Sequence, residues 1–245
     1  MTTHATADKH WTESELEALS IEHGFRLRGL EVTRLDTFID AAFAFAVTLL
    51  VISFDEIPEN LEEMLNAVKR IPAFSASFFV LMMFWLQHRR WSRRYGLENG
   101  ITILFSLMLI FVALVFVFPL RIIFESMFAH LSGGFLPSGF RNNSVEGLRV
   151  MFAFYSSGSL AMSAIVSRLH RAALQRSSLL CLNDVEQLRT RTNMRAWAIV
   201  AAFSLLSILL AIFLPDGLVP LAGYLYFLLF PLFWLTGRYS KAGIA

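Results

Sequence analysis

Charged residues and cysteine are scarce in this chain. Only 16% of its 245 residues are Asp, Glu, Lys or Arg, whereas soluble domains contain about 25%. The single cysteine, Cys181, excludes an internal disulfide and a metal site built from several cysteines. The first 30 residues contain no apolar run of the kind that forms a signal peptide, so we expect a cytosolic leader at residues 1–33.

Motifs that carry enzyme chemistry are also missing from the sequence. We find no Gly-rich phosphate loop, no HExxH metal motif and no GxSxG nucleophile turn. The histidines are scattered without the spacing of metal ligands, and no TVGYG stretch is present to form a carbonyl-lined potassium filter. We therefore expect a protein that is not an enzyme and that holds no cofactor or metal.

Apolar residues, in contrast, are abundant. Hydrophobic residues make up 56% of the chain and aromatic residues 14%, with 24 phenylalanines and a mean hydropathy of +0.58. Apolar runs of about 20 residues have the length of membrane-spanning helices. The sequence therefore predicts an all-α, polytopic membrane protein with six spans. The predicted spans cover residues 37–54, 71–88, 100–120, 147–166, 194–214 and 218–236.

The segments outside these spans complete the predicted organisation. We expect one six-helix membrane domain at residues 34–236 and a cytosolic tail at 237–245. Turn-forming pairs such as Gly133-Gly134 and Leu136-Pro137 predict that residues 121–146 form a connection outside the membrane.

Positive charge predicts the orientation of the chain. With six spans, both termini and the connections after spans two and four lie on one side, and most of the 21 Lys and Arg residues fall there. The five on the other side are Lys69, Arg70, Arg121, Arg141 and Arg149. The positive-inside rule then places both termini in the cytoplasm. We expect the protein in the inner (plasma) membrane of the cell. Because each basic cluster directly follows or precedes a span, we expect membrane lipids, and no nucleic acid, as partners.

The first span begins with charges. Asp40 lies about one turn inside this span, and a carboxylate inside a membrane marks a candidate functional site. Asp36 is four residues earlier, where two ionised carboxylates repel, so we expect Asp40 to have a partner on another helix. Trp85 and His88 lie at the same predicted membrane level on span two. We therefore expect Trp85 and His88 to be partners of Asp40. Alternatively, His88 is an ordinary histidine at the membrane interface and Trp85 belongs to the aromatic belt.

One face of the first span carries a stripe of larger side chains. Phe45, Thr48, Leu49 and Ile52 follow the helical spacing i, i+3, i+4 and i+7, and Phe38 lies seven residues before Phe45. Such a stripe is typical either of a functional surface or of plain packing between helices. The spacing alone leaves both readings open.

These residues resemble a known family. The stretch RLDTFIDAAFAFAVTLLV at residues 34–51 is similar to the first-helix signature of TMEM175-type potassium channels, RxxxFSD followed by a small and apolar run and TLLV. Trp85-x-x-His88 resembles the family's WxxH. Asn99 at the start of span three and Phe118-Pro119 at its end also fit, and the likeness extends over the whole six-span plan.

The resemblance implies a cation channel that prefers potassium. Bacterial members assemble as homotetramers, with the pore lined by the first helix and potassium as the permeating ion. In this chain the narrowest point would be Phe45, followed by Thr48 or Leu49 and then Ile52. Residues of the motif would form an anchoring network at the cytoplasmic end. That network would contain Arg34, Phe38, Asp40, Trp85 and His88.

Two positions depart from the family pattern. Ile39 replaces the motif serine, which removes a hydroxyl from the network. Phe45 replaces the aliphatic residue that is common at the constriction. Four phenylalanines on one axis would either form a narrower plug or turn aside and present ring faces, which attract cations.

Two further functions are open at this point. Asp40 and His88 are titratable groups of the kind found in proton relays, so a proton-conducting or proton-coupled transporter is an alternative. A membrane scaffold or an enzyme of unfamiliar chemistry is a second alternative, although no motif supports it.

Overall fold

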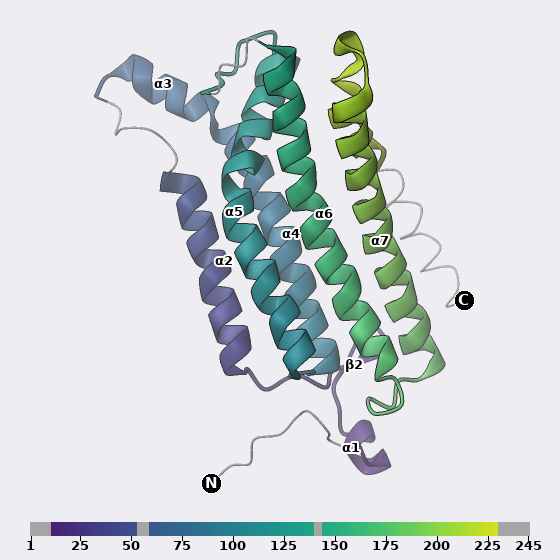
Figure 1. Ribbon diagram of the computed structural model, residues 1–245. Helices are drawn as coiled ribbons and strands as arrows, with labels where there is room; N and C mark the ends of the chain where they lie inside the picture. The colour runs from purple at the N-terminus through teal and green to yellow at the C-terminus, as the bar shows by residue number, and fades with distance from the viewer. Residues whose placement is uncertain (1–10, 53–58, 140–143, 230–245) are drawn as a thin grey trace.

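Five long helices form a bundle with roughly parallel axes (Figure 1). This computed structural model describes residues 11–52, 59–139 and 144–229. The bundle consists of α2 (Arg34–Ile52), α4 (Ile71–Tyr95), α5 (Gly100–Leu131), α6 (Val145–Gln175) and α7 (Asp184–Phe213). The all-α prediction is confirmed apart from one small hairpin, β1 (Ile21–Glu22) paired antiparallel with β2 (Phe25–Arg26).

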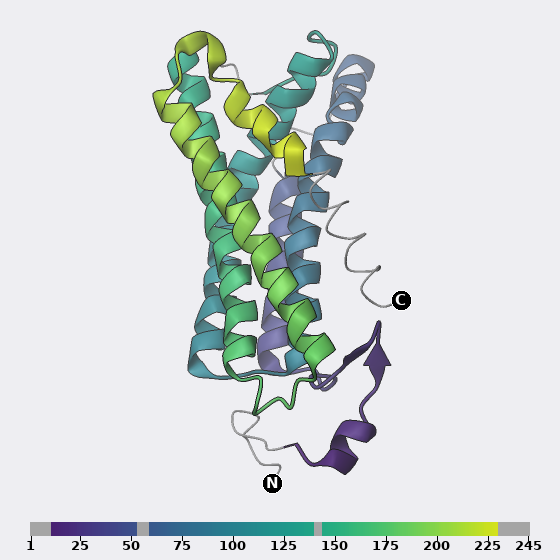
Figure 2. The ribbon, with the colours of Figure 1, turned by 90° about the vertical axis from the view of Figure 1, so that its right-hand side faces the viewer.

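Shorter elements lie at the two ends of the bundle. Helix α1 (Glu13–Glu17) and the hairpin lie at the lower end in Figure 1, and α3 (Leu61–Lys69) leans away from the upper end. After α7 the chain turns back along the bundle (Figure 2). This returning segment contains η1 (Asp216–Leu218), α8 (Leu221–Tyr224) and η2 (Leu225–Leu228).

Four helical segments within the described residues are long and apolar enough to cross a membrane. They cover residues 61–95, 100–131, 145–175 and 184–213 and correspond to predicted spans two to five. The first predicted span is α2, whose start carries three charged residues. Much of the sixth predicted span lies outside the described residues. The count of six spans therefore stays a prediction.

The connection predicted at residues 121–146 begins later than the sequence indicated. Helix α5 continues through Pro119 to Leu131, so this part of the prediction was wrong. Apolar residues continue past the proline, and packing on both sides of it offsets the one backbone hydrogen bond that proline removes. The helix ends just before the predicted turn residues, where Gly133 and Gly134 adopt positive φ angles of 62° and 88°.

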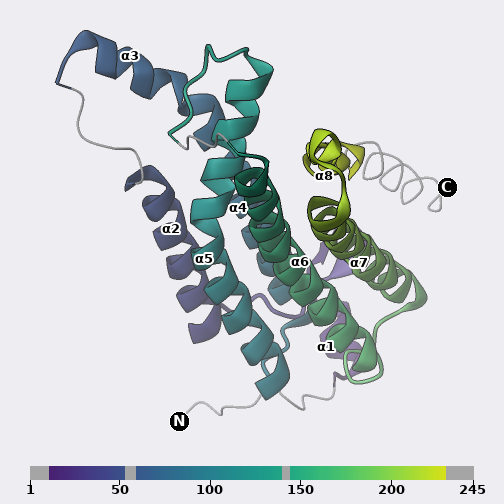
Figure 3. The same cartoon turned by 45° about the horizontal axis from the view of Figure 1, so that its top comes forward.

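The core lies between the long helices. Phe43 of α2, Leu81 of α4, Leu109 and Phe116 of α5 and Met162 of α6 are all nearly inaccessible to solvent and belong to one hydrophobic cluster. Helices α6 and α7 run side by side in Figures 1 and 3.

Buried serines join α6 to α7. Ser156 and Ser207 share a hydrogen bond of 2.8 Å between their hydroxyl oxygens, and Ser204 donates to Ser159 at 2.9 Å. Small hydroxyl side chains allow close approach of membrane helices and supply polar contacts between them. The pairing of α6 and α7 leaves α2 on the other side of the bundle, at its edge (Figure 1).

Candidate functional site

The start of α2 is fixed by a reciprocal cap. The backbone N–H of Asp36 donates to Thr33 Oγ1 at 3.1 Å, and Thr33 Oγ1 donates to Asp36 Oδ2 at 3.0 Å. This arrangement satisfies backbone donors that the first turn of a helix leaves unpaired. The cap therefore holds the Asp36 side chain in place.

Two carboxylates on α2 bind side chains of α4. Asp36 Oδ1 accepts a hydrogen bond from Ser92 Oγ at 2.7 Å, and Asp40 Oδ1 accepts one from Trp85 Nε1, also at 2.7 Å. The guanidinium of Arg89 lies 5.4 Å from the centre of the Trp85 ring. The contacts advance along α2 as they go back along α4, so the two helices are antiparallel. Each carboxylate thus has a donor that offsets the repulsion between them.

His88 has a different environment from the one expected. Its side chain is buried, and Nε2 lies 2.9 Å from Ser106 Oγ of α5. A spacing of three residues on a helix is a rotation of about 60° from the starting direction. Trp85 therefore faces α2, while His88 turns toward α5.

Arg34 also lies apart from the predicted network. It is the first residue of α2, its side chain is exposed, and within the described residues it forms no hydrogen bond or ion pair with Asp40, Trp85 or His88. Among the described residues of one chain, the contact between Asp40 and Trp85 is therefore the part of the predicted cluster that is present. The contact between Asp36 and Ser92 was not predicted, although the spacing Thr33-x-x-Asp36 is a signal for the cap.

The predicted pore stripe lies partly on the exposed face of α2. Phe38 is 57% exposed and Phe45 55% exposed, and Thr48 is exposed as well. Leu49 instead packs against the core, so of the two residues considered for the layer after Phe45 it is Thr48 that faces outward. The side chain of Ile52 lies outside the described residues.

The exposed face of α2 has features suited to a small cation. Thr48 Oγ1 donates its proton to the Ala44 carbonyl at 3.0 Å. The lone pairs of that hydroxyl therefore remain available to accept or coordinate. The large ring of Phe45 lies about one turn earlier on this face. The arrangement places a hydroxyl oxygen next to an apolar ring at the edge of the bundle.

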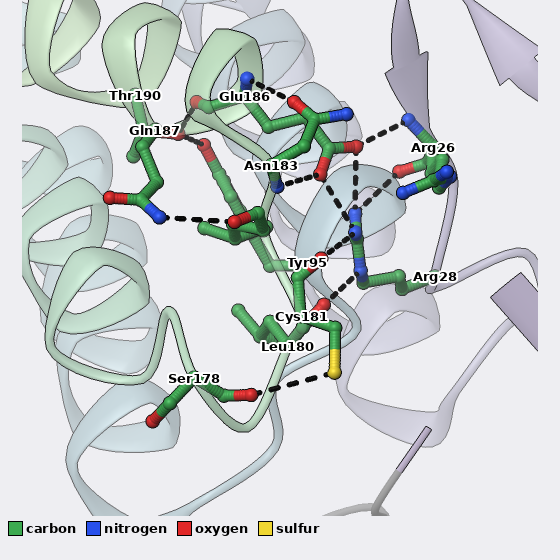
Figure 4. Close-up of polar contacts among 11 residues, drawn as sticks. Arg26, Arg28, Tyr95, Ser178, Leu180, Cys181, Asn183, Glu186, Gln187 and Thr190 are labelled. Atoms are coloured by element: carbon green, nitrogen blue, oxygen red, sulfur yellow. Dashed lines mark hydrogen bonds and ion pairs between the residues drawn. The ribbon is translucent and has the colours of Figure 1, made fainter. Parts of the chain in front are cut away.

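A second polar centre, which the sequence did not reveal, joins the N-terminal hairpin segment to α7 (Figure 4). Arg28 Nη2 and Glu186 Oε2 form an ion pair at 2.8 Å, and both side chains are fully buried. Arg28 Nε also donates to the Leu180 carbonyl at 2.7 Å, and Glu186 accepts from the backbone N–H of Arg26 at 2.8 Å. These contacts tie the N-terminal hairpin to the start of α7.

Aromatic packing extends this tie to α4. Phe25 of the hairpin is fully buried and meets the Tyr95 ring edge to face at 5.4 Å. The Tyr95 hydroxyl shares a 2.7 Å hydrogen bond with Thr190 of α7. Gly29 then passes close to Gly96, where a Cβ on Gly29 would lie 2.8 Å from the Gly96 Cα. The segment that leads into α2 is thus held against the ends of α4 and α7.

Comparisons with known proteins identify a family and several similar proteins. The family described as "Endosomal/lysosomal potassium channel TMEM175" matches residues 34–119. A protein of Marivirga tractuosa named "Potassium channel" is 31% identical over 232 residues, which cover 91% of this chain and 93% of that protein.

A solved structure of a named channel also resembles this one. The potassium channel MtTMEM175, crystallised as a variant with a nanobody–MBP fusion protein, has a TM-score of 0.78 at 29% identity. The match covers 91% of this chain and 100% of that one. A lysosomal potassium-selective channel TMEM175 homolog from Chamaesiphon minutus has 21% identity and a TM-score of 0.47, covering 79% of this chain and 95% of that one. With the 31% identity along most of its length and the family match over the helices that carry the contacts of Asp36 and Asp40, this chain belongs to the TMEM175 family of potassium channels.

Proposed function

We propose that this protein is a homotetrameric potassium-preferring leak channel whose pore is lined by α2. The observation that carries the proposal is the exposed stripe of Phe38, Phe45 and Thr48 on a helix at the edge of the bundle. Inside a membrane this exposed face would meet either lipid or another subunit, and we place a second copy of the same helix against it, with the Thr48 hydroxyl toward a water-filled axis. The relatives named as potassium channels support the choice of ion.

The proposed channel has six spans in the inner membrane and both termini in the cytoplasm. Residues 1–33 form the leader, 34–236 the membrane domain and 237–245 the tail. Potassium is the permeating ion, and no cofactor takes part. Since the relatives are named as channels, we propose transport and not catalysis as the function.

The proposed constriction is the ring of Phe45 side chains. A ring of apolar side chains excludes water from a narrow pore and so acts as a gate. Thr48 would form the next layer and offer hydroxyl oxygens in place of part of the ion's hydration shell. Asp36 and Asp40, held by α4, would set the rotation of α2 about its own axis and so the direction in which Phe45 points.

Potassium flux into liposomes tests the proposed constriction. We expect Phe45→Ala to raise the flux of the reconstituted protein at least severalfold, because a smaller side chain widens and wets the narrowest point. Phe111→Ala is the matched control, since Phe111 is a 69% exposed phenylalanine on α5 and should leave the flux unchanged.

The same assay separates the channel from the alternative of proton transport through Asp40 and His88. Potassium flux that persists without a pH gradient and in Asp40→Asn agrees with a channel. No potassium flux from either the parent protein or Phe45→Ala would refute the proposal. Flux that requires a pH gradient and vanishes in Asp40→Asn would favour the proton alternative.

A further inference from the structure

Three arginines line a groove between α6 and α7. The groove has a volume of about 450 Å³, and Arg168 and Arg171 of α6 face Arg195 of α7 across it. Apolar side chains complete its wall, among them Met194 and Ala198. Ser167 Oγ donates to the Met194 carbonyl at 3.0 Å, which holds the two helices together at this level.

The charges of this groove are not compensated within the described part of the chain. Arg168, Arg171 and Arg195 are exposed and form no ion pair with any described residue. Other arginines of the chain are paired, as Arg28 is with Glu186 and Arg149 with Asp216. Three unpaired guanidinium groups in one groove make a site of concentrated positive potential, which attracts an anion.

The groove lies at the boundary of the apolar part of the bundle. Residues 150–167 of α6 and 196–213 of α7 contain no charged side chain, and each stretch rises about 27 Å as a helix. At one end of both stretches Arg149 binds Asp216 at 2.7 Å. At the other end are Arg168 and Arg195. Because a hydrocarbon core is about 30 Å thick, the groove falls at the level of the lipid headgroups.

We propose that this groove binds the phosphate of an anionic glycerophospholipid, such as phosphatidylglycerol, in the leaflet whose headgroups lie at the level of the groove. A planar guanidinium donates two parallel hydrogen bonds to phosphate oxygens, and two such groups on facing helices hold the phosphate from both sides. The small side chain of Ala198, on the membrane side of Arg195, leaves room for the lipid chains. A zwitterionic lipid brings its own cationic group toward the arginines and binds less well.

Lipid titration of the full-length protein in detergent tests this site, with bound lipids counted by native mass spectrometry. We expect phosphatidylglycerol to bind at least tenfold more tightly than phosphatidylcholine. Arg168→Gln with Arg195→Gln should weaken phosphatidylglycerol binding by about fivefold for each arginine removed. Arg168→Lys with Arg195→Lys keeps the charge, loses the paired hydrogen bonds, and should give an intermediate affinity.

The matched control removes equal charge elsewhere. Arg90→Gln with Arg191→Gln takes two exposed arginines from the same end of the bundle outside the groove, and should leave the affinity unchanged. An equal loss in both glutamine pairs would show a general surface effect and overturn the proposal. So would equal binding of the two lipids. Competition by inorganic phosphate as effective as that by the lipid would point to a soluble anion and also overturn it.

Discussion

The Asp40 carboxylate accepts a hydrogen bond from Trp85 and is therefore not free. A hydrogen bond of 2.7 Å from an indole N–H to a carboxylate fixes the donor as well as the acceptor. With the contact of Asp36 and Ser92, it fastens the first two turns of α2 to the last turns of α4. Phe45 is little more than one turn further along α2, so its direction depends on these contacts. The geometry therefore supports a positioning role for Asp40.

Trp85→Phe should destabilise the protein by about 1 kcal/mol, because a smaller aromatic ring remains while the N–H donor to Asp40 is lost. Asp40→Ala removes the acceptor of the same bond. In thermal unfolding of the purified protein, the double variant should therefore lose less stability than the sum of the losses in the two single variants. Strictly additive losses would show that the two side chains are not coupled.

A buried ion pair holds the N-terminal hairpin against the long helices. Two strands of two residues each do not form a stable unit alone. Arg28 and Glu186 supply the anchor, and Asn183 N–H also donates to Glu186 at 3.2 Å. Because both charged side chains are fully buried, each depends on the other for compensation.

Arg28→Met should destabilise the fold by about 3–5 kcal/mol, since it leaves the Glu186 carboxylate buried without its partner. The double change Arg28→Met with Glu186→Gln should recover part of this loss. Thermal unfolding gives the first quantity, and hydrogen exchange of the hairpin amides shows whether the hairpin detaches.

Arg93→Met is the control for this experiment. Arg93 and Glu22 form a pair at 3.6 Å with both side chains well exposed, and such pairs contribute at most about 1 kcal/mol. A loss in Arg28→Met no larger than in Arg93→Met, with unchanged hairpin exchange, would argue against the buried pair as an anchor.

Local features of the fold could be predicted from the sequence, while contacts between distant segments could not. Apolar runs and helical spacing identified α4 to α7, and the need of Asp40 for a donor pointed to the end of span two that contains Trp85. Spacing on α4 did not reveal that His88 turns to Ser106 of α5, because the direction of α5 depends on packing. Glu186 is 158 residues from Arg28, and no local pattern joins them.

Assembly of several copies into a tetramer is a property of the whole molecule that an experiment can test. If α2 lines the axis of a homotetramer, position 45 of each copy lies near the same position of its neighbours. The sequence offers a clean way to test this, since Cys181 is its single cysteine. Cys181→Ser therefore gives a background in which one introduced thiol reports one distance.

In this background, Phe45→Cys should be cross-linked between copies by a short bis-maleimide in the membrane, because the pore axis brings these positions together. Phe79→Cys should not be, since Phe79 is 69% exposed on α4, a helix that does not line the proposed pore. Native mass spectrometry of the uncross-linked protein should give four times the chain mass of 27.8 kDa. A monomeric mass, or equal cross-linking at both positions, would contradict a tetramer with α2 at its centre, and with it the assignment of Phe45 to the constriction.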